Sequence, residues 1–181
     1  MPVSDCPTRL ESAAGLASPV RQPTTCAPSV NDIDNFKALN TQYTEAKVDR
    51  NLLPRFTSAI EAHVYHHGFA YRQGGDEYLI LLPSMSRAFA LAFLDELRCK
   101  LAALRYPLIE GSTTVSIGVC IAGPDCPLTD RELWERANQA KEFAKKNGRN
   151  CIATFDGERF TPEELQIVIP ITFGPTFRRQ D

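Results

Sequence analysis

The sequence predicts an α/β fold of the α+β sandwich type, in which helices pack on a mixed sheet. Three observations lead to this prediction. Residues 115–121 alternate apolar with small residues, which is the period of a strand. Two apolar runs, 69–72 and 77–82, flank a turn with two glycines and predict a β-hairpin. Apolar residues also repeat every four positions over 46–64, which indicates a helix.

The first half of the expected fold runs from this helix through the hairpin to a second helix. Pro54 starts a new turn of the first helix or kinks it. The hairpin turn projects Asp76 and Glu77 near its tip. Ser84 or Ser86 caps the second helix, which continues to about residue 104.

The second half begins with the strand at 115–121. Thr129 and Glu132 then form a capping box for a helix that ends at Gly148. Residues 151–155 predict a short strand, 161–164 a helical turn, and 167–173 a last strand interrupted by Pro170. The elements therefore follow the order helix, hairpin, helix, strand, helix, strand.

The ends of the chain differ from its middle. Prolines recur among Ser, Thr and Ala in residues 1–31, so we expect a flexible, disordered leader there. The folded domain is expected over 32–156. Residues 157–181 form a C-terminal extension, in which 166–172 could add an edge strand to the sheet.

Composition excludes several classes of function. The chain has 181 residues, and its 20 Lys and Arg against 22 Asp and Glu give a net charge of -2. No basic field is therefore expected to hold a nucleic acid or an acidic membrane surface. Six cysteines occur without a CxxC pair, no secretory signal opens the chain, and no apolar run is long enough to span a membrane. We expect one domain in the reducing cytoplasm.

Acidic residues lie in two places that suit metal-assisted chemistry. Asp32 and Asp34 lie in one segment, and Asp76 and Glu77 lie in the hairpin turn. A magnesium ion takes one or two protein carboxylates and keeps several waters, so acids from separate segments could form one centre. Either pair alone would more simply be interpreted as exposed loop acids.

The turn sequence Gly74-Gly75-Asp76-Glu77-Tyr78 resembles the signature of the GGDEF family of diguanylate cyclases. Four further stretches match the family in order. Residues 32–40 resemble DxDxFKxxN, Asp49 matches the acid of a GD pair, 114–119 resemble TxSIGV, and 144–150 match AKxxGRN. The resemblance covers residues 32–152.

This resemblance implies a palm-like nucleotide cyclase fold with a mainly antiparallel sheet and a βαββαβ core. It implies a bacterial second-messenger enzyme that joins two GTP into cyclic di-GMP and releases pyrophosphate. Each subunit of a homodimer would hold one GTP, with Mg²⁺ or Mn²⁺ as the cofactor.

The resemblance also assigns roles to residues. Asp49 would favour guanine over adenine, because its carboxylate accepts from the ring N–H and amino group of guanine. Metal binding is implied for the carboxylates of Asp32 and Asp76 and the backbone carbonyl of Ile33. Catalytic roles are implied for Asp76, Glu77 and Lys37. Substrate binding is implied for Phe36, Lys37, Asn40, Asp49, Gly74, Gly75, Lys145 and Arg149.

The chain departs from the family pattern in three places. Residues 10–31 lack the usual LTGLxNR helix, and Pro28 and Asn31 weaken the expected first strand. The guanine loop carries other residues where the family usually has Asp, Gly, His and Gly. The inhibitory RxxD motif is absent at 65–68, so we expect no product inhibition of that type. We expect no sensor domain in the leader, so any regulation would come from a separate protein.

Other interpretations remain open at this point. The main alternative is a degenerate GGDEF module that binds GTP or a protein partner without turnover. A third hypothesis is a palm-type cyclase that makes another cyclic nucleotide, and Asp49 argues against it. Among single residues, Phe36 and Tyr78 also fit core aromatics, and Lys145 and Arg149 fit helix-end cations. The histidines at 63, 66 and 67 are interpreted as a solvated helix end without a functional role.

Overall fold

The computed structural model describes residues 26–155 and 166–168, which form a six-stranded mixed sheet with helices on both faces. The strands lie side by side in the order β2-β3-β1-β4-β5-β6. Only the β4–β5 pair is parallel. The strands are β1 Cys26–Ile33, β2 Phe69–Gly74, β3 Glu77–Pro83, β4 Val115–Cys120, β5 Ile152–Phe155 and β6 Gln166–Val168. The helices are α1 Phe36–Tyr43, α2 Glu45–Asn51, α3 Leu53–Val64, α4 Arg87–Ala103 and α5 Asp130–Lys146.

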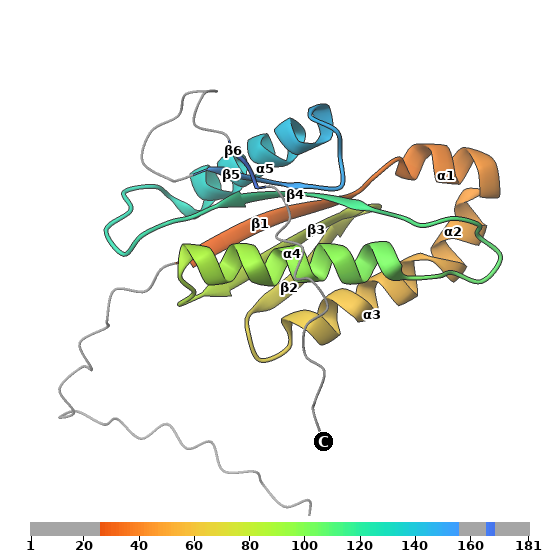
Figure 1. Ribbon diagram of the computed structural model, residues 1–181, viewed down its shortest axis with the longest axis horizontal. Coiled ribbons are helices and arrows are strands. Elements are labelled where there is room, and N and C mark those ends of the chain that lie inside the picture. The colour runs from red at the N-terminus through yellow and green to blue at the C-terminus, as the bar shows by residue number, and fades with distance from the viewer. Residues whose placement is uncertain (1–25, 156–165, 169–181) are drawn as a thin grey trace, which may run out of the picture.

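The sheet separates two apolar layers. Helices α3 and α4 cover one face, and α5 covers the other (Figure 1). The larger core cluster lies between the sheet and the α3–α4 pair, with Phe56, Tyr78 and Leu97 among its buried side chains. A smaller cluster under α5 includes Val30 and Phe155. This arrangement confirms the expected α/β sandwich with a mainly antiparallel sheet.

The leader was expected to extend to residue 31, but β1 already begins at Cys26. Its eight residues lie between β3 and β4, and all but the first are buried. Pro28 is tolerated because the pairing with β4 is interrupted there, between the Cys26–Ala122 bridge and the ladder that begins at Ser29. The buried Asn31 side chain donates to the Ser29 and Tyr78 carbonyl oxygens. Residues 1–25 of the expected leader lie outside the described residues.

Most of the other expected elements are confirmed. Pro54 lies in the first turn of α3, which is a separate helix from α2. The sequence predicted a new turn or a kink at this residue. Ser86 caps α4, and Thr129 and Glu132 form the capping box of α5. Residues 166–168 pair with β5 as an edge strand, which confirms part of the expected last strand. The helical turn at 161–164 and the remainder of the strand at 169–173 lie outside the described residues.

Helix α1 was not predicted. It has eight residues, of which only Phe36 is buried, so its apolar period is too short to detect. Both of its ends have unusual backbone conformations: Asn35 lies at φ 58° and Thr44 at φ 68°. The second value is uncommon for a β-branched residue.

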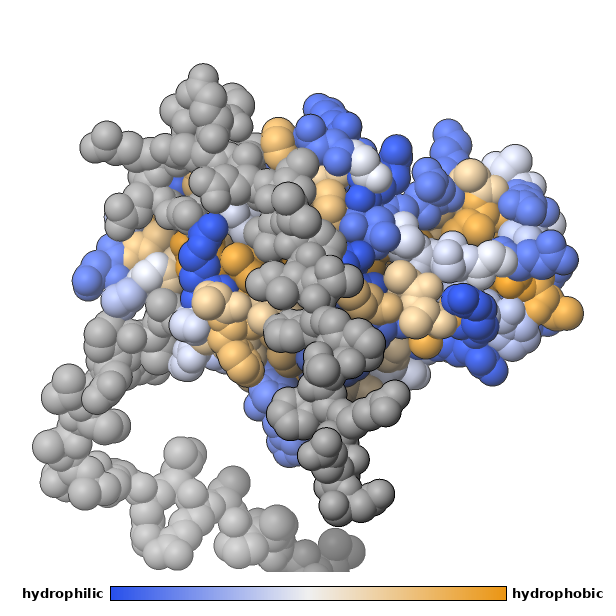
Figure 2. Space-filling model, in the orientation of Figure 1, coloured by the Kyte–Doolittle hydropathy of each residue, from blue (hydrophilic) through white to orange (hydrophobic). Residues whose placement is uncertain are grey.

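Within residues 26–155 and 166–168, no helix combines the length and hydropathy that a bilayer crossing requires. On the face in Figure 2, hydrophilic and hydrophobic side chains of the described residues are interspersed.

Gly118 of β4 sets the distance between the sheet and α5. A Cβ atom at this position would lie 2.1 Å from both the Ala137 carbonyl oxygen and the Lys141 backbone nitrogen. Those atoms belong to the helix backbone and cannot rotate away, so only glycine allows α5 to lie this close.

Gly118→Ala should therefore destabilise the protein by about 3 kcal/mol, because the added methyl group forces α5 off the sheet. Urea unfolding followed by the fluorescence of Trp134, the single tryptophan, measures this loss. Gly123→Ala is the matched control, since nothing lies within 4 Å of the position that its methyl group would take. Equal stability of the two variants would contradict the close packing of α5.

His63 joins α3 to α4 and is not part of a solvated helix end. Its Nε2 lies 2.9 Å from the Phe93 carbonyl oxygen, and its Nδ1 lies 3.1 Å from the Lys100 Nζ. The carbonyl can only accept, so Nε2 carries the hydrogen and Nδ1 accepts from Lys100. Burial lowers the pKa of His63 below 6.5; the bond to Phe93 opposes this shift, and Lys100 adds to it.

A lowered pKa in the folded state means that His63 stabilises the fold fully above pH 6.5 and loses this contribution as pH falls through the folded pKa. The free energy of unfolding should thus fall between about pH 7.5 and about pH 5.5, and His63→Gln should flatten this slope. Urea titrations at both pH values measure it. A slope unchanged by His63→Gln would exclude His63 as its source.

Candidate functional site

The candidate site lies where the end of β1, the β2–β3 turn, the start of α1 and the end of α5 meet. The Ile33 amide donates to the Asp76 carbonyl oxygen at 3.1 Å and so ties β1 to the turn. An open pocket of about 540 Å³ lies here. Its lining residues are Asp32, Ile33, Asn35, Phe36, Lys37, Ala38, Thr41, Asp76, Lys145 and Arg149.

Asp32 is the buried acid of this pocket. It lies in β1 opposite Glu77 of β3 and Ser116 of β4, and it is 5% exposed. Its Oδ2 pairs with the Lys145 Nζ at 2.7 Å, while its buried Oδ1 has no hydrogen-bond partner. Burial raises the pKa of Asp32, and Asp76 adds to the rise; Lys145 opposes it without reversing it.

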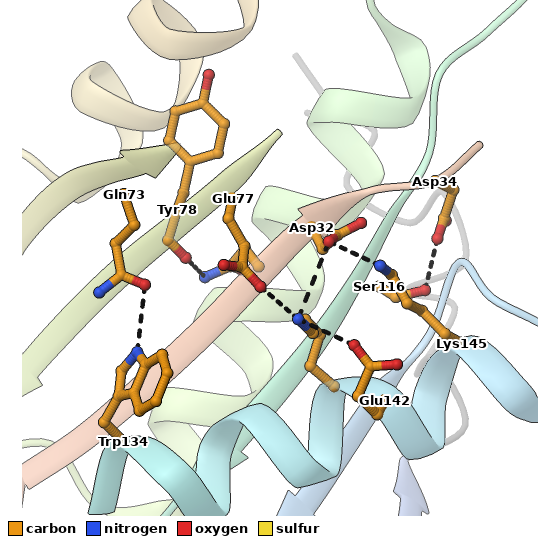
Figure 3. A network of polar contacts seen from close by, with 11 residues as sticks. Asp32, Asp34, Gln73, Glu77, Tyr78, Ser116, Trp134, Glu142 and Lys145 are labelled. Atoms are coloured by element: carbon orange, nitrogen blue, oxygen red, sulfur yellow. Dashed lines mark hydrogen bonds and ion pairs between the residues drawn. The ribbon is translucent and has the colours of Figure 1, made fainter. Parts of the chain in front are cut away.

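Lys141 is a further cation beside this site, and it was not expected from the sequence. Figure 3 shows Asp32 and Glu77 extending from their strands toward α5, from which Glu142 and Lys145 extend. The Lys141 ammonium bonds directly to Glu77 and lies 3.1 Å from Glu142 and 3.9 Å from Asp32. Burial lowers the pKa of Lys141, but the bonds to Glu77 and Glu142 outweigh it, so the pKa is raised and the side chain is charged. Its position one helical turn before Lys145 was the available signal.

Asp34, the second acid of its segment, is held by hydrogen bonds within the fold. Its carboxylate accepts from the Thr114 and Ser116 hydroxyls at 2.6 Å each and from the Asn150 amide at 3.1 Å. The side chain is buried, and it therefore ties the end of β1 to the start of β4 and to the loop after α5. Asp34 does not line the pocket.

The loop after α5 places Arg149 at the pocket. Gly148, Arg149 and Asn150 all have positive φ, at 111°, 59° and 47°. Besides the Asp34 bond, the Asn150 side chain accepts from the buried Arg98 guanidinium at 2.7 Å. The loop is thus held on both sides in a conformation that non-glycine residues rarely adopt.

The start of α1 contributes backbone donors. The first amide groups of a helix have no partner within the helix, and the Asn35 side chain does not cap them. Residues 35–38 line the pocket; the Ala38 amide already donates to the Asn35 carbonyl oxygen, so the Phe36 and Lys37 amides and the Lys37 side chain suit an anion there. Phe36 packs against the turn, at 3.6 Å from a methyl position on Gly75.

Not all of the expected site residues line this pocket. The pocket brings together Asp32, Ile33, Phe36, Lys37, Asp76, Lys145 and Arg149, and leaves Asn40, Asp49, Gly74, Gly75 and Glu77 outside its lining. Asp49 is exposed on α2, and the Asn40 Oδ1 is buried without a partner. Thr44, between α1 and α2, has φ 68° and ψ 144°, a conformation that glycine adopts far more readily.

The residues present fit a hard divalent cation. Within the described part of the chain, no group of three or more His, Cys, Asp or Glu converges on a metal position. Magnesium, however, needs only one or two carboxylates. The unpartnered, buried Oδ1 of Asp32 beside the pocket that Asp76 also lines meets this need.

Several known proteins are similar in sequence to this chain. The family model described as "Diguanylate cyclase, GGDEF domain" matches residues 11–151. A diguanylate cyclase of Vibrio cholerae is 30% identical over 146 residues, which are 78% of this chain and 43% of that protein. The cyclic di-GMP phosphodiesterase PdeR of Escherichia coli is 31% identical over 138 residues, 76% of this chain and 20% of that protein. The chain therefore spans less than half the length of these two relatives.

Solved structures resemble the fold over most of the chain. The GGDEF domain of DgcB from Caulobacter crescentus, in complex with c-di-GMP, has a TM-score of 0.66 and 28% identity, covering 72% of this chain and 78% of that one. The diguanylate cyclase SiaD of Pseudomonas aeruginosa, in complex with its activator SiaC, has a TM-score of 0.68 and 27% identity, covering 75% and 52%.

Asp34→Ala should destabilise the protein by about 3 kcal/mol, because it leaves two hydroxyls and one amide without their shared acceptor. Urea unfolding followed by Trp134 fluorescence provides the measurement. Asp125→Ala, at an exposed position in the loop after β4, removes the same charge and should change stability little. Similar stabilities for both variants would show that the Asp34 bonds do not hold the site together.

Proposed function

We propose, since this chain belongs to the GGDEF domain family of diguanylate cyclases, that it condenses two GTP molecules into cyclic di-GMP with release of pyrophosphate. The observation that carries the proposal is the pocket itself. It combines a buried carboxylate with a free oxygen, a second carboxylate from the hairpin turn, and cations from two further segments. This combination suits a metal-bound triphosphate.

In this proposal Asp32 and Asp76 hold the divalent cation, with the Ile33 backbone carbonyl as a third ligand. Bound there, Mg²⁺ or Mn²⁺ neutralises phosphate charge and favours ionisation of the attacking hydroxyl. Asp32 needs little rearrangement for this role, because its Oδ1 has no other partner and its Oδ2 is already held by Lys145.

The triphosphate is assigned to the cations around the pocket. Lys145 and Arg149 approach from the end of α5 and the following loop, and Lys37 and the amide groups of Phe36 and Lys37 approach from α1. Charge-assisted bonds to phosphate oxygens would supply the local positive charge that the acidic chain lacks overall.

Guanine is assigned to the adjoining α1–α2 surface. Asn40 and Asp49 lie outside the pocket lining, and the buried Oδ1 of Asn40 is unpartnered. An acceptor in that state suits a base N–H, and the Asp49 carboxylate would select guanine. Gly74 and Gly75 leave the turn open to the nucleotide, since nothing lies within 4 Å of a methyl position on Gly74.

The reaction requires two chains. Each 3′-hydroxyl attacks the α-phosphorus of the opposite GTP, its proton passes to Asp76, and the bond to pyrophosphate breaks. Glu77 adjoins Asp76 and is the further acid of the centre. A homodimer with two facing pockets brings the two nucleotides together, and the product is expected in the cytoplasm, where GTP is available.

The second candidate function is a GGDEF module that binds GTP or a protein partner without turnover. Two observations favour it: Asn40 and Asp49 do not line the pocket, and Thr44 holds the α1–α2 junction in a conformation unfavourable for its side chain. A separate regulatory protein is a further proposal. SiaD, bound to an activator, provides the precedent among the similar structures.

Incubation of the protein with GTP and Mg²⁺ or Mn²⁺, followed by chromatography and mass spectrometry, should give cyclic di-GMP. Asp76→Asn should lower the rate by about a hundredfold or more, because the proton acceptor and a metal ligand are lost. Asp125→Asn removes an equal charge far from the pocket and should keep the wild-type rate.

GTP binding measured in parallel separates the two candidate functions. Metal-dependent GTP binding without product selects the binding module. A rate that Asp76→Asn leaves intact would exclude the assigned centre, and products formed equally from ATP would exclude the guanine assignment. Added cyclic di-GMP should leave the rate unchanged, because residues 65–68 lack the RxxD motif.

A further inference from the structure

Lys141 is the most deeply buried cation near the candidate site. Its side chain is only 4% exposed. Lysine is rarely buried to this extent unless it has an ionic partner. The backbone of α5 lies against Gly118 at this residue, so the side chain starts at the sheet surface and extends across β1. It reaches Glu77 rather than solvent.

Lys141 lies near three acids: Glu142 of its own helix, at 3.1 Å, and Glu77 and Asp32 of the sheet. The two sheet acids are held differently. Asp32 keeps one carboxylate oxygen without a partner, and its other oxygen pairs with Lys145 at 2.7 Å. Glu77 bonds through its Oε1 to the Lys141 ammonium, which also lies 3.9 Å from the Asp32 Oδ2. The ammonium thus stands between two carboxylates from adjacent strands, a position that a second divalent cation takes in two-metal phosphoryl-transfer sites.

We propose that Lys141 is a built-in counter-cation that keeps Glu77 out of metal coordination, so that the site takes a single divalent cation through Asp32 and Asp76. The inference rests on the proposed metal-dependent function but concerns a residue outside the motifs. Lys141 acts through Glu77 and is a positioning residue. It supplies one positive charge to the acids in the absence of metal, and it leaves only the Asp32 side of the cluster open to a cation.

Removal of the Lys141 ammonium should release Glu77. Lys141→Met keeps an unbranched side chain of similar length against the sheet and removes the charge. Glu77 then has no cationic partner and becomes available to a metal. Lys146→Met is the matched control, because Lys146 lies on the same helix, is exposed, and its loss changes the net charge equally.

Titration of the full chain with Mn²⁺ alone, followed by the electron paramagnetic resonance signal of free Mn²⁺, tests this directly. The wild type and Lys146→Met should bind one ion per chain. Lys141→Met should bind a second ion, or bind the first about tenfold more tightly. The double variant Lys141→Met/Glu77→Gln should lose this gain.

Three results would overturn the proposal: identical binding by Lys141→Met and the wild type, a gain that persists in the double variant, or no Mn²⁺ binding by any variant. If Lys141→Met does not fold, Glu77→Gln in the wild-type chain decides the matter. This variant should still bind one ion, and loss of the ion would show that Glu77 is a ligand. No nucleotide is present, so a chain that forms no cyclic di-GMP can still pass or fail this test.

Discussion

The close contact between α5 and β4 is the constraint on which the candidate site depends. At Gly118 the helix backbone lies where any side chain would collide with it, and this places Lys141 directly on the sheet. From there Lys141 reaches Glu77, and Lys145, one turn later, reaches Asp32. Two ammonium groups can therefore meet two carboxylates, and the two most buried of these groups, Lys141 and Asp32, would each be costly without a partner.

Strand pairing supplies the acids that these cations meet. Because β1 lies between β3 and β4, Asp32 lies beside Glu77 on one side and Ser116 on the other. The next acid along the chain, Asp34, does not join the pocket but accepts hydrogen bonds from Thr114, Ser116 and the Asn150 amide, which immediately follows Arg149. Two acids separated by one residue thus have different tasks: Asp32 has a free oxygen for a ligand, and Asp34 has none to spare.

The sequence was informative where local signals were strong and agreed with the fold. The capping box at Thr129, the Ser86 cap and the hairpin glycines marked elements that the structure contains. It was misleading at β1, because Pro28 and the polar residue Asn31 are unfavourable in a central strand unless neighbours compensate. The interrupted ladder and the carbonyl groups around Asn31 do so, but these are tertiary features. Lys141 was also missed: its position one helical turn before Lys145 was the signal in the sequence, and the fold was needed to show that this lysine faces the sheet.

In our proposal the acids of the site have different roles: Asp32 and Asp76 are available to a metal, and Glu77 is held by Lys141. A crystal structure with a non-hydrolysable GTP analogue and Mn²⁺, with manganese located by its anomalous scattering, tests it most directly. One manganese ion per chain is expected between Asp32 and Asp76, with Glu77 still bonded to Lys141. A manganese ion coordinated by Glu77, or a nucleotide bound away from Lys145 and Arg149, would contradict it.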